Sequence, residues 1–266
     1  MTLKDKYGSW ALITGASSGI GEEFARHLAS HGLNLILVAR RKDRLEKIAS
    51  DLKKENGVEI AVVQIDLKNE NFLDKLKEIT DDKEIGILIN NAGFGSNGEF
   101  IDVDSNLEAD MVKVNCLAPT ILTHHFVKPM VQRRKGAIIF LGSVVACQPT
   151  PYMTTYAATK VFNAYLGDAL WYELKKYNID VLTLNPGGTN TEFQRIANAS
   201  TGPTPRTTKQ VVDTAIKALG NKPGVIDGFL NKLMGISSRF GSRKTVVKIS
   251  GLITKKLYTK KYESND

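Results

Sequence analysis

Short apolar runs alternate along the chain with longer segments in which apolar residues recur every three or four positions. The short runs are rich in Ile, Leu and Val, as is typical of strands buried on both faces. We expect strands over residues 10–14, 33–39, 58–65, 85–90, 137–141 and 179–184. We expect helices over residues 19–30, 43–55, 70–80, 107–134 and 154–177. This alternation predicts right-handed crossovers and an α/β fold with a doubly wound parallel sheet.

The composition is that of a folded domain with an added tail. The chain has 266 residues, of which 42% are hydrophobic and 24% charged, and these values exclude general disorder. No linker divides it, so we predict a single catalytic domain over residues 1–227 and a basic, helical C-terminal extension over residues 228–266. Cys116 and Cys147 lack metal-ligand spacing, so we expect two buried thiols, no metal site and a reducing, cytoplasmic compartment. The apolar stretch behind the first lysines is too short for a signal peptide.

Most of the positive charge lies in the extension. The net charge is +8, and residues 228–262 contain nine Lys or Arg and no Asp or Glu. The region lacks the interleaved aromatic residues of a nucleic-acid surface, so we expect no nucleic-acid partner. A helix is predicted over about residues 242–260, with Val246, Val247, Ile249, Ile253 and Leu257 on one side and Lys244, Lys248 and Lys255 on the other. Its apolar side either packs on the protein or on a partner subunit, or lies on an anionic membrane as a peripheral contact.

A glycine-rich turn joins the first predicted strand to the first predicted helix, and it reads Thr14-Gly15-Ala16-Ser17-Ser18-Gly19-Ile20-Gly21. Glycines let a backbone turn tightly, and the N–H groups and dipole of a following helix favour a phosphate. The spacing Gly-x-x-x-Gly-x-Gly differs from the standard dinucleotide fingerprint. We nevertheless expect the turn to bind the pyrophosphate of a dinucleotide, through Gly15, Ser17, Ser18, Gly19, Ile20 and Gly21.

The second strand ends in cations where an NAD site has an acid. Ala39 is followed by Arg40, Arg41 and Lys42, and the first carboxylate comes only at Asp43. An acid at this place would hold the ribose 2′-hydroxyl of NAD. Arg40 beside the small Ala39 instead favours the 2′-phosphate of NADP(H), which a guanidinium binds through two hydrogen bonds. The other interpretation of Arg40 is a solvated surface charge.

Three side chains are candidates for proton transfer, although a tyrosine and a lysine four positions apart also occur by chance in many helices. Ser143 follows the fifth predicted strand, and Tyr156 and Lys160 lie one turn apart on one helix face. A free tyrosine has a pKa of about 10, and a nearby ammonium group, together with the positive nicotinamide ring of an oxidised cofactor, would stabilise the phenolate and lower that pKa. Tyr156 could then act as general acid and base, with Ser143 hydrogen-bonded to the substrate oxygen.

Together these motifs resemble the short-chain dehydrogenase/reductase superfamily, in its compact single-domain branch with a Tyr-x-x-x-Lys active site, over about residues 8–195. The resemblance implies a Rossmann-like fold, a nicotinamide cofactor and catalysis by Asn115, Ser143, Tyr156 and Lys160. It also implies cofactor contacts from Asp66, Leu67, Asn91, Ala92, Gly93, Tyr156, Lys160, Pro186, Gly187, Thr189 and Thr191. In this family Asn90 would brace the sheet, Asn115 would anchor a water in a proton relay, and Lys160 would also bind the nicotinamide ribose.

These features predict an NADP(H)-dependent oxidoreductase that moves a hydride between nicotinamide and a carbonyl or alcohol carbon. We expect an apolar substrate, such as a ketoacyl chain, a steroid-like ketone or a fatty aldehyde. Candidate substrate contacts are Phe94, Val145, Gln148, Tyr152, Met153 and a lid over residues 190–206 that includes Phe193 and Arg195. Relatives pair through helices that match residues 107–134 and 154–177, so we expect a homodimer or homotetramer. The alternatives are a cofactor-sensing binding protein with little turnover and a membrane-surface interaction protein.

Overall fold

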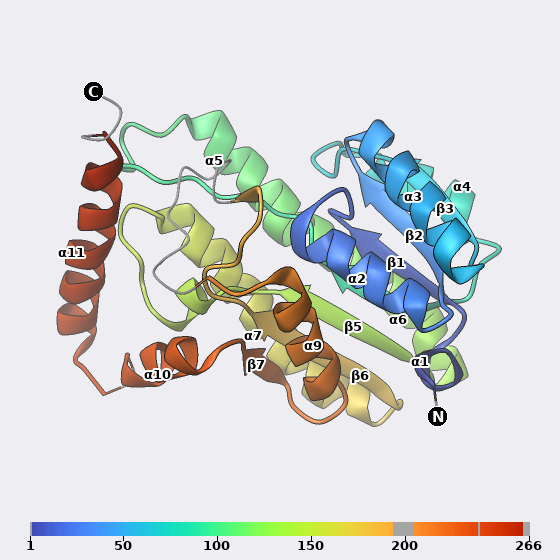
Figure 1. Ribbon diagram of the computed structural model, residues 1–266. Coiled ribbons are helices and arrows are strands. Elements are labelled where there is room, and N and C mark those ends of the chain that lie inside the picture. Colours follow the sequence, from blue (N-terminus) through green and yellow to red (C-terminus); the bar gives the residue numbers. More distant parts are fainter. Residues whose placement is uncertain (1, 194–204, 239, 263–266) are drawn as a thin grey trace.

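The central sheet is parallel and doubly wound (Figure 1). The computed structural model describes residues 2–193, 205–238 and 240–262, and in them seven strands follow the order β3-β2-β1-β4-β5-β6-β7. The strands are β1 (Trp10–Thr14), β2 (Asn34–Ala39), β3 (Ile60–Gln64), β4 (Ile85–Asn90), β5 (Gly136–Leu141), β6 (Ile179–Asn185) and β7 (Gly224–Ile226). Each pairs in parallel with its neighbours. The strand order reverses between β1 and β4, which is where ligands bind in sheets of this kind.

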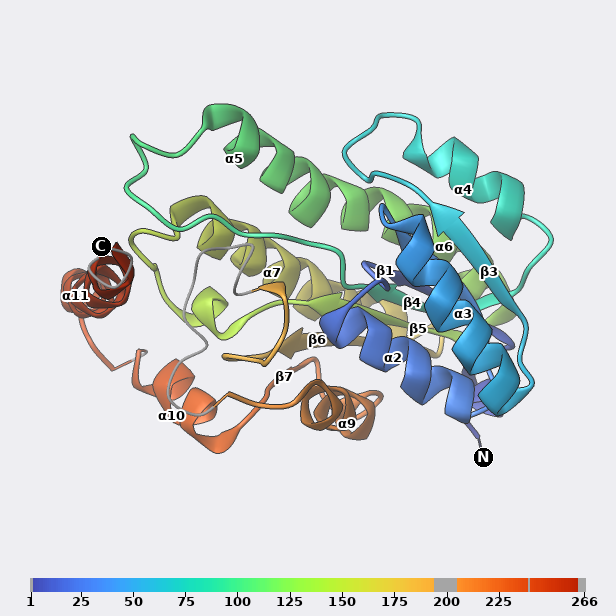
Figure 2. The same ribbon diagram turned by 45° about the horizontal axis from the view of Figure 1, so that its top comes forward.

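Helices cover both faces of the sheet (Figure 2). They are α1 (Leu3–Tyr7), α2 (Gly19–Ser30), α3 (Lys42–Asn56), α4 (Phe72–Thr80), α5 (Ser105–Val112), the π-helical turn η1 (Lys113–Leu117), α6 (Ala118–Arg133), the 3-10 turn η2 (Val144–Cys147), α7 (Thr154–Lys175), α9 (Thr208–Ala218), α10 (Phe229–Ser237) and α11 (Arg243–Tyr262). On one face α2, α3 and α9 bury residues such as Phe24, Leu45 and Val212 against the strands. On the other face α4, α6 and α7 bury residues such as Leu76 and Phe126.

The predicted fold class is confirmed, and all six predicted strands are present. The predicted helix over residues 107–134 consists of α5, η1 and α6 in succession, with Pro119 in the first turn of α6. Sequence analysis missed α1, β7, α9 and α10. β7 has three half-buried residues, too few to show a period. α9 buries Val211, Val212 and Ala215 at helical spacing, so its pattern was present in the sequence.

The helix predicted in the extension is present as α11, but its apolar side is divided. Val246 and Val247 are half-buried, whereas Ile249 and Ile253 are exposed; the side chain of Leu257 lies outside the described part of the chain. The predicted stripe is therefore not packed on the body as a whole, because Ser250 and Thr254 are buried while Ile249 and Ile253 are exposed. No helix in the described residues is both long and apolar enough to cross a membrane.

Of the two cysteines, only Cys116 is buried as expected, and burial raises the pKa of its thiol to about 11. Cys147 is half-buried, because it lies in η2 at the carboxyl edge of the sheet.

Candidate active site

The glycine-rich turn has the conformation that glycine permits and other residues resist. Gly15 and Gly19 have φ angles of +67° and +62°, in the left-handed region that costs a residue with a Cβ atom energy. A Cβ on Gly21 would collide with the carbonyl oxygen of Gly15. Ser18 is the N-cap residue of α2, so the first N–H groups of that helix lie at the carboxyl edge of the sheet, where they can bind phosphate.

Thr14 and Asn91 tie this turn to the end of β4. The Thr14 hydroxyl accepts the N–H groups of Asn91 and Ala92, both at 3.0 Å. The Asn91 amide in turn donates to the Thr14 carbonyl at 2.8 Å. Asn90 instead donates to the Thr123 hydroxyl at 3.0 Å inside the core, where it joins β4 to α6. Asn91 and Ala92 are thus positioned beside the predicted phosphate site, and Asn90 lies away from it as a brace.

Arg41, rather than its neighbour Arg40, lies against the turn. The Arg41 guanidinium donates to the hydroxyls of Ser17 at 3.0 Å and Ser18 at 2.8 Å. Arg40 is exposed at the end of β2. The two arginines are adjacent in sequence, and Arg41 is the N-cap residue of α3. The chain direction at the start of that helix therefore decides which of the two cations reaches the serines.

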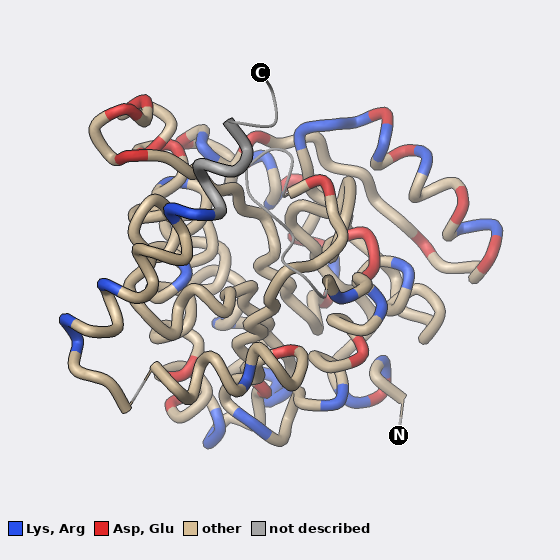
Figure 3. The backbone as a smooth tube through the Cα atoms, turned by 60° about the vertical axis from the view of Figure 1, so that its left-hand side comes forward, with Lys and Arg blue, Asp and Glu red and all other residues tan. Residues whose placement is uncertain are grey.

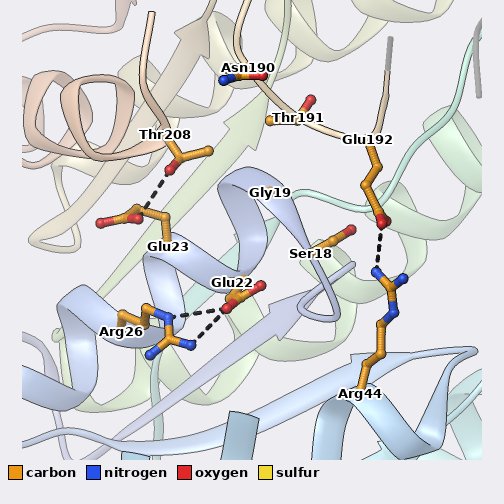
Figure 4. A pocket seen from close by; sticks show the side chains of 10 residues that line it. All are labelled: Ser18, Gly19, Glu22, Glu23, Arg26, Arg44, Asn190, Thr191, Glu192 and Thr208. Atoms are coloured by element: carbon orange, nitrogen blue, oxygen red, sulfur yellow. Dashed lines mark hydrogen bonds and ion pairs between the residues drawn. The ribbon is translucent and has the colours of Figure 1, made fainter. Parts of the chain in front are cut away.

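Glu192, in the loop after β6, reaches the same place from the other side. Its carboxylate accepts from Arg41 and from Arg44, each at 2.8 Å, and these hydrogen bonds lower the pKa of Glu192 to about 2. Figure 4 shows Arg44 and Glu192 facing each other across a pocket that Gly19 and Thr191 also line. A Cβ on Gly19 would lie 3.2 Å from the methyl group of Thr191, so the loop packs directly on the turn. A carboxylate thus occupies an anion site made by two arginines beside the turn.

The other cofactor residues implied by the family resemblance lie at the same edge of the sheet, because parallel strands end on the same side. Asp66 and Leu67 come just after β3, with Leu67 buried. Pro186 and Gly187 follow β6 directly. Thr189 is buried, and its hydroxyl donates to the Gly187 carbonyl at 3.1 Å.

Ser143, Tyr156 and Lys160 are buried together where β5 ends and α7 begins. Ser143 lies close enough to Tyr156 to favour its phenolate, which lowers the pKa of Tyr156 slightly against the effect of burial. The Lys160 ammonium donates to the Leu141 carbonyl at 2.7 Å and lies 5.7 Å from the centre of the Tyr156 ring. The Ser143 N–H donates to the side-chain oxygen of Asn185 at 3.1 Å. Sequence analysis missed Asn185 as a positioning residue; its place at the last position of β6 was the available signal.

Burial sets the proton affinities of this group. It raises the pKa of Tyr156 to about 12, against the smaller effect of Ser143, and it lowers the pKa of Lys160 to about 8. The expected lowering of the Tyr156 pKa is therefore wrong for the protein without cofactor, because the ammonium of Lys160 binds the Leu141 carbonyl and burial disfavours the phenolate. At neutral pH Tyr156 carries its proton, which is the form that can act as an acid.

Asn115 lies in η1, a π-helical turn of the kind that is frequent at functional sites. Its side chain accepts from the Phe94 N–H at 3.1 Å and donates to the Phe94 carbonyl at 2.9 Å and to the Thr159 hydroxyl at 3.0 Å. Its main-chain carbonyl accepts from Asn163 at 2.9 Å. Asn115 thus holds the loop after β4 against α7. Asn163 was missed in the sequence, although it is a buried polar residue one turn beyond Lys160.

The predicted substrate contacts lie in the loop after β4, in η2 and in the segment between η2 and α7. They are all half-buried and comprise Phe94, Val145, Gln148, Tyr152 and Met153. The Phe193 ring packs on the Tyr156 ring, with 5.4 Å between their centres. Residues 194–204 of the predicted lid, with Arg195, lie outside the described residues. Where the chain is described again, Arg206 forms an ion pair with buried Asp227 at 3.0 Å. In the described ranges no group of three or more His, Cys, Asp or Glu side chains is arranged to hold a metal.

Comparison with known proteins finds named relatives over most of the chain. Very-long-chain 3-oxoacyl-CoA reductase of Homo sapiens is 33% identical over 233 residues, which cover 86% of this chain and 74% of that protein. Hydroxysteroid dehydrogenase-like protein 1 of Gallus gallus is 37% identical over 184 residues, which cover 68% of this chain and 56% of that protein. The Pongo abelii protein named inactive hydroxysteroid dehydrogenase-like protein 1 is 35% identical over 188 residues, which cover 69% of this chain and 57% of that protein. The chain therefore spans little more than half the length of the last two relatives.

Solved structures share the fold. A 7beta-hydroxysteroid dehydrogenase superimposes with a TM-score of 0.87 at 26% identity, covering 94% of this chain and 99% of that one. A short-chain dehydrogenase from Sphingobium yanoikuyae in complex with NADPH gives a TM-score of 0.78 at 33% identity, and the match covers 86% of this chain and 92% of that one. Residues 9–202 match the family model described as short chain dehydrogenase. Because this match includes the glycine-rich turn and the buried serine, tyrosine and lysine, the chain belongs to the short chain dehydrogenase family, whose enzymes act on CH–OH and C=O groups.

Proposed function

We propose that this protein is an NADPH-dependent reductase of apolar ketones or aldehydes, and that it catalyses the reverse oxidation of the corresponding alcohols. The observation that carries the proposal is the buried Tyr156, which is protonated at neutral pH, with the buried Ser143 beside it and Lys160 one turn away. A buried acid can protonate a carbonyl oxygen as that oxygen gains negative charge, and a neighbouring hydroxyl can stabilise the charge by a hydrogen bond.

Each residue of the site has a separate role in the proposed reaction. The bound nicotinamide would supply the hydride to the carbonyl carbon. Tyr156 would donate its proton to the carbonyl oxygen, while the Ser143 hydroxyl would hydrogen-bond that oxygen and orient it. Asn185 keeps Ser143 in place through its main-chain N–H. Lys160, kept one turn from the tyrosine, would stabilise the phenolate that remains after proton transfer.

The residues at the carboxyl edge fit a dinucleotide with a 2′-phosphate. The turn from Gly15 to Gly21 leads into the N-terminus of α2, which suits a pyrophosphate. Arg41 and Arg44 already hold one anionic group, the carboxylate of Glu192. We therefore assign the 2′-phosphate first to Arg41, with exposed Arg40 as a second cation on the same side. The NADPH complex of the Sphingobium relative supports the choice of NADPH over NADH.

The proposed substrate class is supported by the half-buried candidate contacts, most of which are apolar, and by Phe193 against the Tyr156 ring. The names of the relatives point to ketoacyl and steroid carbonyls. The test is NADPH oxidation with a panel of 3-ketoacyl thioesters of increasing length, steroid ketones and fatty aldehydes. We expect turnover of at least one apolar class, and loss of turnover with retained NADPH binding in Tyr156→Phe, which removes only the proton donor. Near-normal turnover by Tyr156→Phe would overturn the mechanism.

A cofactor-binding protein with little turnover is the second candidate, because one relative is named inactive. The two candidates differ in one measurement. A binding protein would hold NADPH and show no NADPH oxidation with any member of the panel, and its Tyr156→Phe variant would then behave like the unchanged protein.

We also propose that the chain forms at least a dimer through α5, η1 and α7. Large apolar side chains are exposed on these elements, namely Leu107, Val112, Leu117, Phe162, Tyr165 and Tyr172, and an uncovered apolar patch of this kind marks an interface. Sedimentation velocity should show an oligomer that Tyr165→Glu with Tyr172→Glu converts to a monomer. A wild-type monomer at every concentration would refute the proposal.

A further inference from the structure

α11 contacts the body through small and polar residues. Ser250 and Thr254 are buried, and Gln148 donates to the Ser250 hydroxyl at 3.4 Å. A Cβ on Gly251 would lie 3.3 Å from the Pro151 side chain. Gln148 and Pro151 lie between η2 and α7, so α11 docks beside the catalytic edge of the sheet. Figures 1 and 2 show α11 on the outside of the molecule, beyond the ends of the strands.

The opposite side of α11 exposes large apolar residues. Leu252 is two positions from both Ser250 and Thr254, about 200° around the helix from each, and is 72% exposed. Ile249 and Ile253 beside it are 53% and 56% exposed. The helix therefore points its polar contacts inward and its aliphatic side chains outward. Exposed aliphatic groups are unfavourable in water, so this arrangement indicates a surface that another phase or molecule covers.

α10, the helix that precedes α11 in the chain, also exposes large apolar residues. A Cβ on its Gly235 would lie 2.8 Å from the Ile226 side chain and 3.0 Å from the Cys147 sulfur, so the helix packs closely on β7 and η2. Its Phe229 is 79% exposed, and Leu230 and Leu233 are exposed too. We define the C-terminal apolar surface as the exposed side chains of Phe229, Leu230, Leu233, Ile249, Leu252 and Ile253.

The charged residues of α10 and α11 have one sign. Exposed lysines accompany the apolar residues on both helices, namely Lys232, Lys244, Lys248, Lys255 and Lys256. Residues 228–262 contain no Asp or Glu. Figure 3 shows Lys and Arg segments along α11 with no acidic segment between them. A partner that fits must therefore accept apolar side chains and offer negative charge.

We propose that the C-terminal apolar surface binds an anionic lipid bilayer, with its aliphatic side chains in the interfacial region and its lysines at the headgroups. A second copy of this chain fits less well. A two-fold contact would place this basic surface against itself, with no carboxylate from residues 228–262 to pair with the lysines. The proposal depends neither on the substrate nor on turnover. If the proposed activity also holds, the catalytic edge would lie next to a membrane in which apolar carbonyl compounds dissolve.

The test is co-sedimentation of the full chain with phosphatidylcholine vesicles, with and without phosphatidylserine, at low and high salt. We expect binding to the vesicles with phosphatidylserine, weakened by salt. Lys248→Gln with Lys255→Gln should lower the affinity about 30-fold, since each lysine near an anionic surface contributes roughly fivefold. Leu252→Asn with Ile253→Asn should weaken binding at both salt concentrations. Far-UV circular dichroism checks that each variant is folded.

A matched control separates this surface from the net charge of the protein. Lys53→Gln with Lys54→Gln removes two exposed lysines from α3, which is far from α11 in Figure 1, and should leave vesicle binding unchanged. Equal losses in the two lysine pairs would overturn the proposal, as would a wild-type protein that stays in solution at low salt. If Leu252→Asn with Ile253→Asn dissociates an oligomer and leaves vesicle binding intact, the surface is a contact between copies of this chain and the lipid proposal is wrong.

Discussion

Replacing Arg41 with alanine should weaken NADPH binding much more than NADH binding. Its guanidinium lies 3.0 Å from the Ser17 hydroxyl, 2.8 Å from the Ser18 hydroxyl and 2.8 Å from the Glu192 carboxylate. A hydrogen bond to a charged group contributes about 1.5–3 kcal/mol. Because Arg41 is partly exposed and NADPH must displace Glu192 from it, we take the lower end, about 1.5 kcal/mol, which is roughly tenfold in Kd. NADH has no 2′-phosphate, so its Kd should change less than about threefold.

Glu192→Gln should have the opposite effect, since the amide no longer competes with the phosphate for Arg41 and Arg44. Exposed ion pairs are weak, so we expect NADPH binding to tighten by only a few fold, and less at high salt. Both cofactors can be titrated by fluorescence quenching against each variant. Arg26→Ala is the matched control: Arg26 lines the same pocket but is paired with Glu22 at 2.8 Å, so its loss should leave the NADPH to NADH ratio unchanged.

Two results would refute this reasoning. Equal weakening of NADPH and NADH by Arg41→Ala would show that Arg41 shapes the turn without binding the phosphate. A larger selective loss in Arg40→Ala than in Arg41→Ala would return the assignment to Arg40, the residue that the sequence favours.

The remaining predictions concern the catalytic edge. The pKa of Lys160 is about 8, so kcat/KM for carbonyl reduction should be constant below that pH and fall above it as the ammonium loses its proton; a flat profile to high pH would contradict this role. Asn185→Ala leaves the buried Ser143 N–H without its acceptor and should cost about 1–3 kcal/mol in urea unfolding and lower kcat, while Asn185→Asp should restore both in part; an unchanged kcat in the alanine variant would remove Asn185 as a positioning residue. Gly21→Ala should abolish binding of NADPH and NADH alike, because its methyl group collides with the Gly15 carbonyl; normal titration of either cofactor would contradict that.

The elements that the sequence predicted best are those whose packing leaves a periodic pattern. β1, β4 and α2 begin and end at the predicted residues, because β1 and β4 lie inside the sheet and α2 buries one face along its whole length. α10 was missed because its apolar residues are exposed and follow no buried face. η1 was missed because a π-helical turn within a helix leaves no distinct pattern of apolar residues.

The sequence by itself determined the fold class and the glycine-rich turn, because both depend on local patterns along the chain. Ser143, Tyr156 and Lys160 became candidates only through the resemblance of all the motifs together to the family. Only the tertiary structure decided what surrounds them. Arg41 rather than Arg40 reaches the turn, and Glu192, 151 positions further on, is its partner. Burial of Tyr156 outweighs the opposing effect of Ser143 and raises the pKa of its phenol instead of lowering it. Leu252 points outward because Ser250 meets Gln148 on the body. Each of these depends on contacts between segments far apart in the chain, which a one-dimensional pattern does not contain.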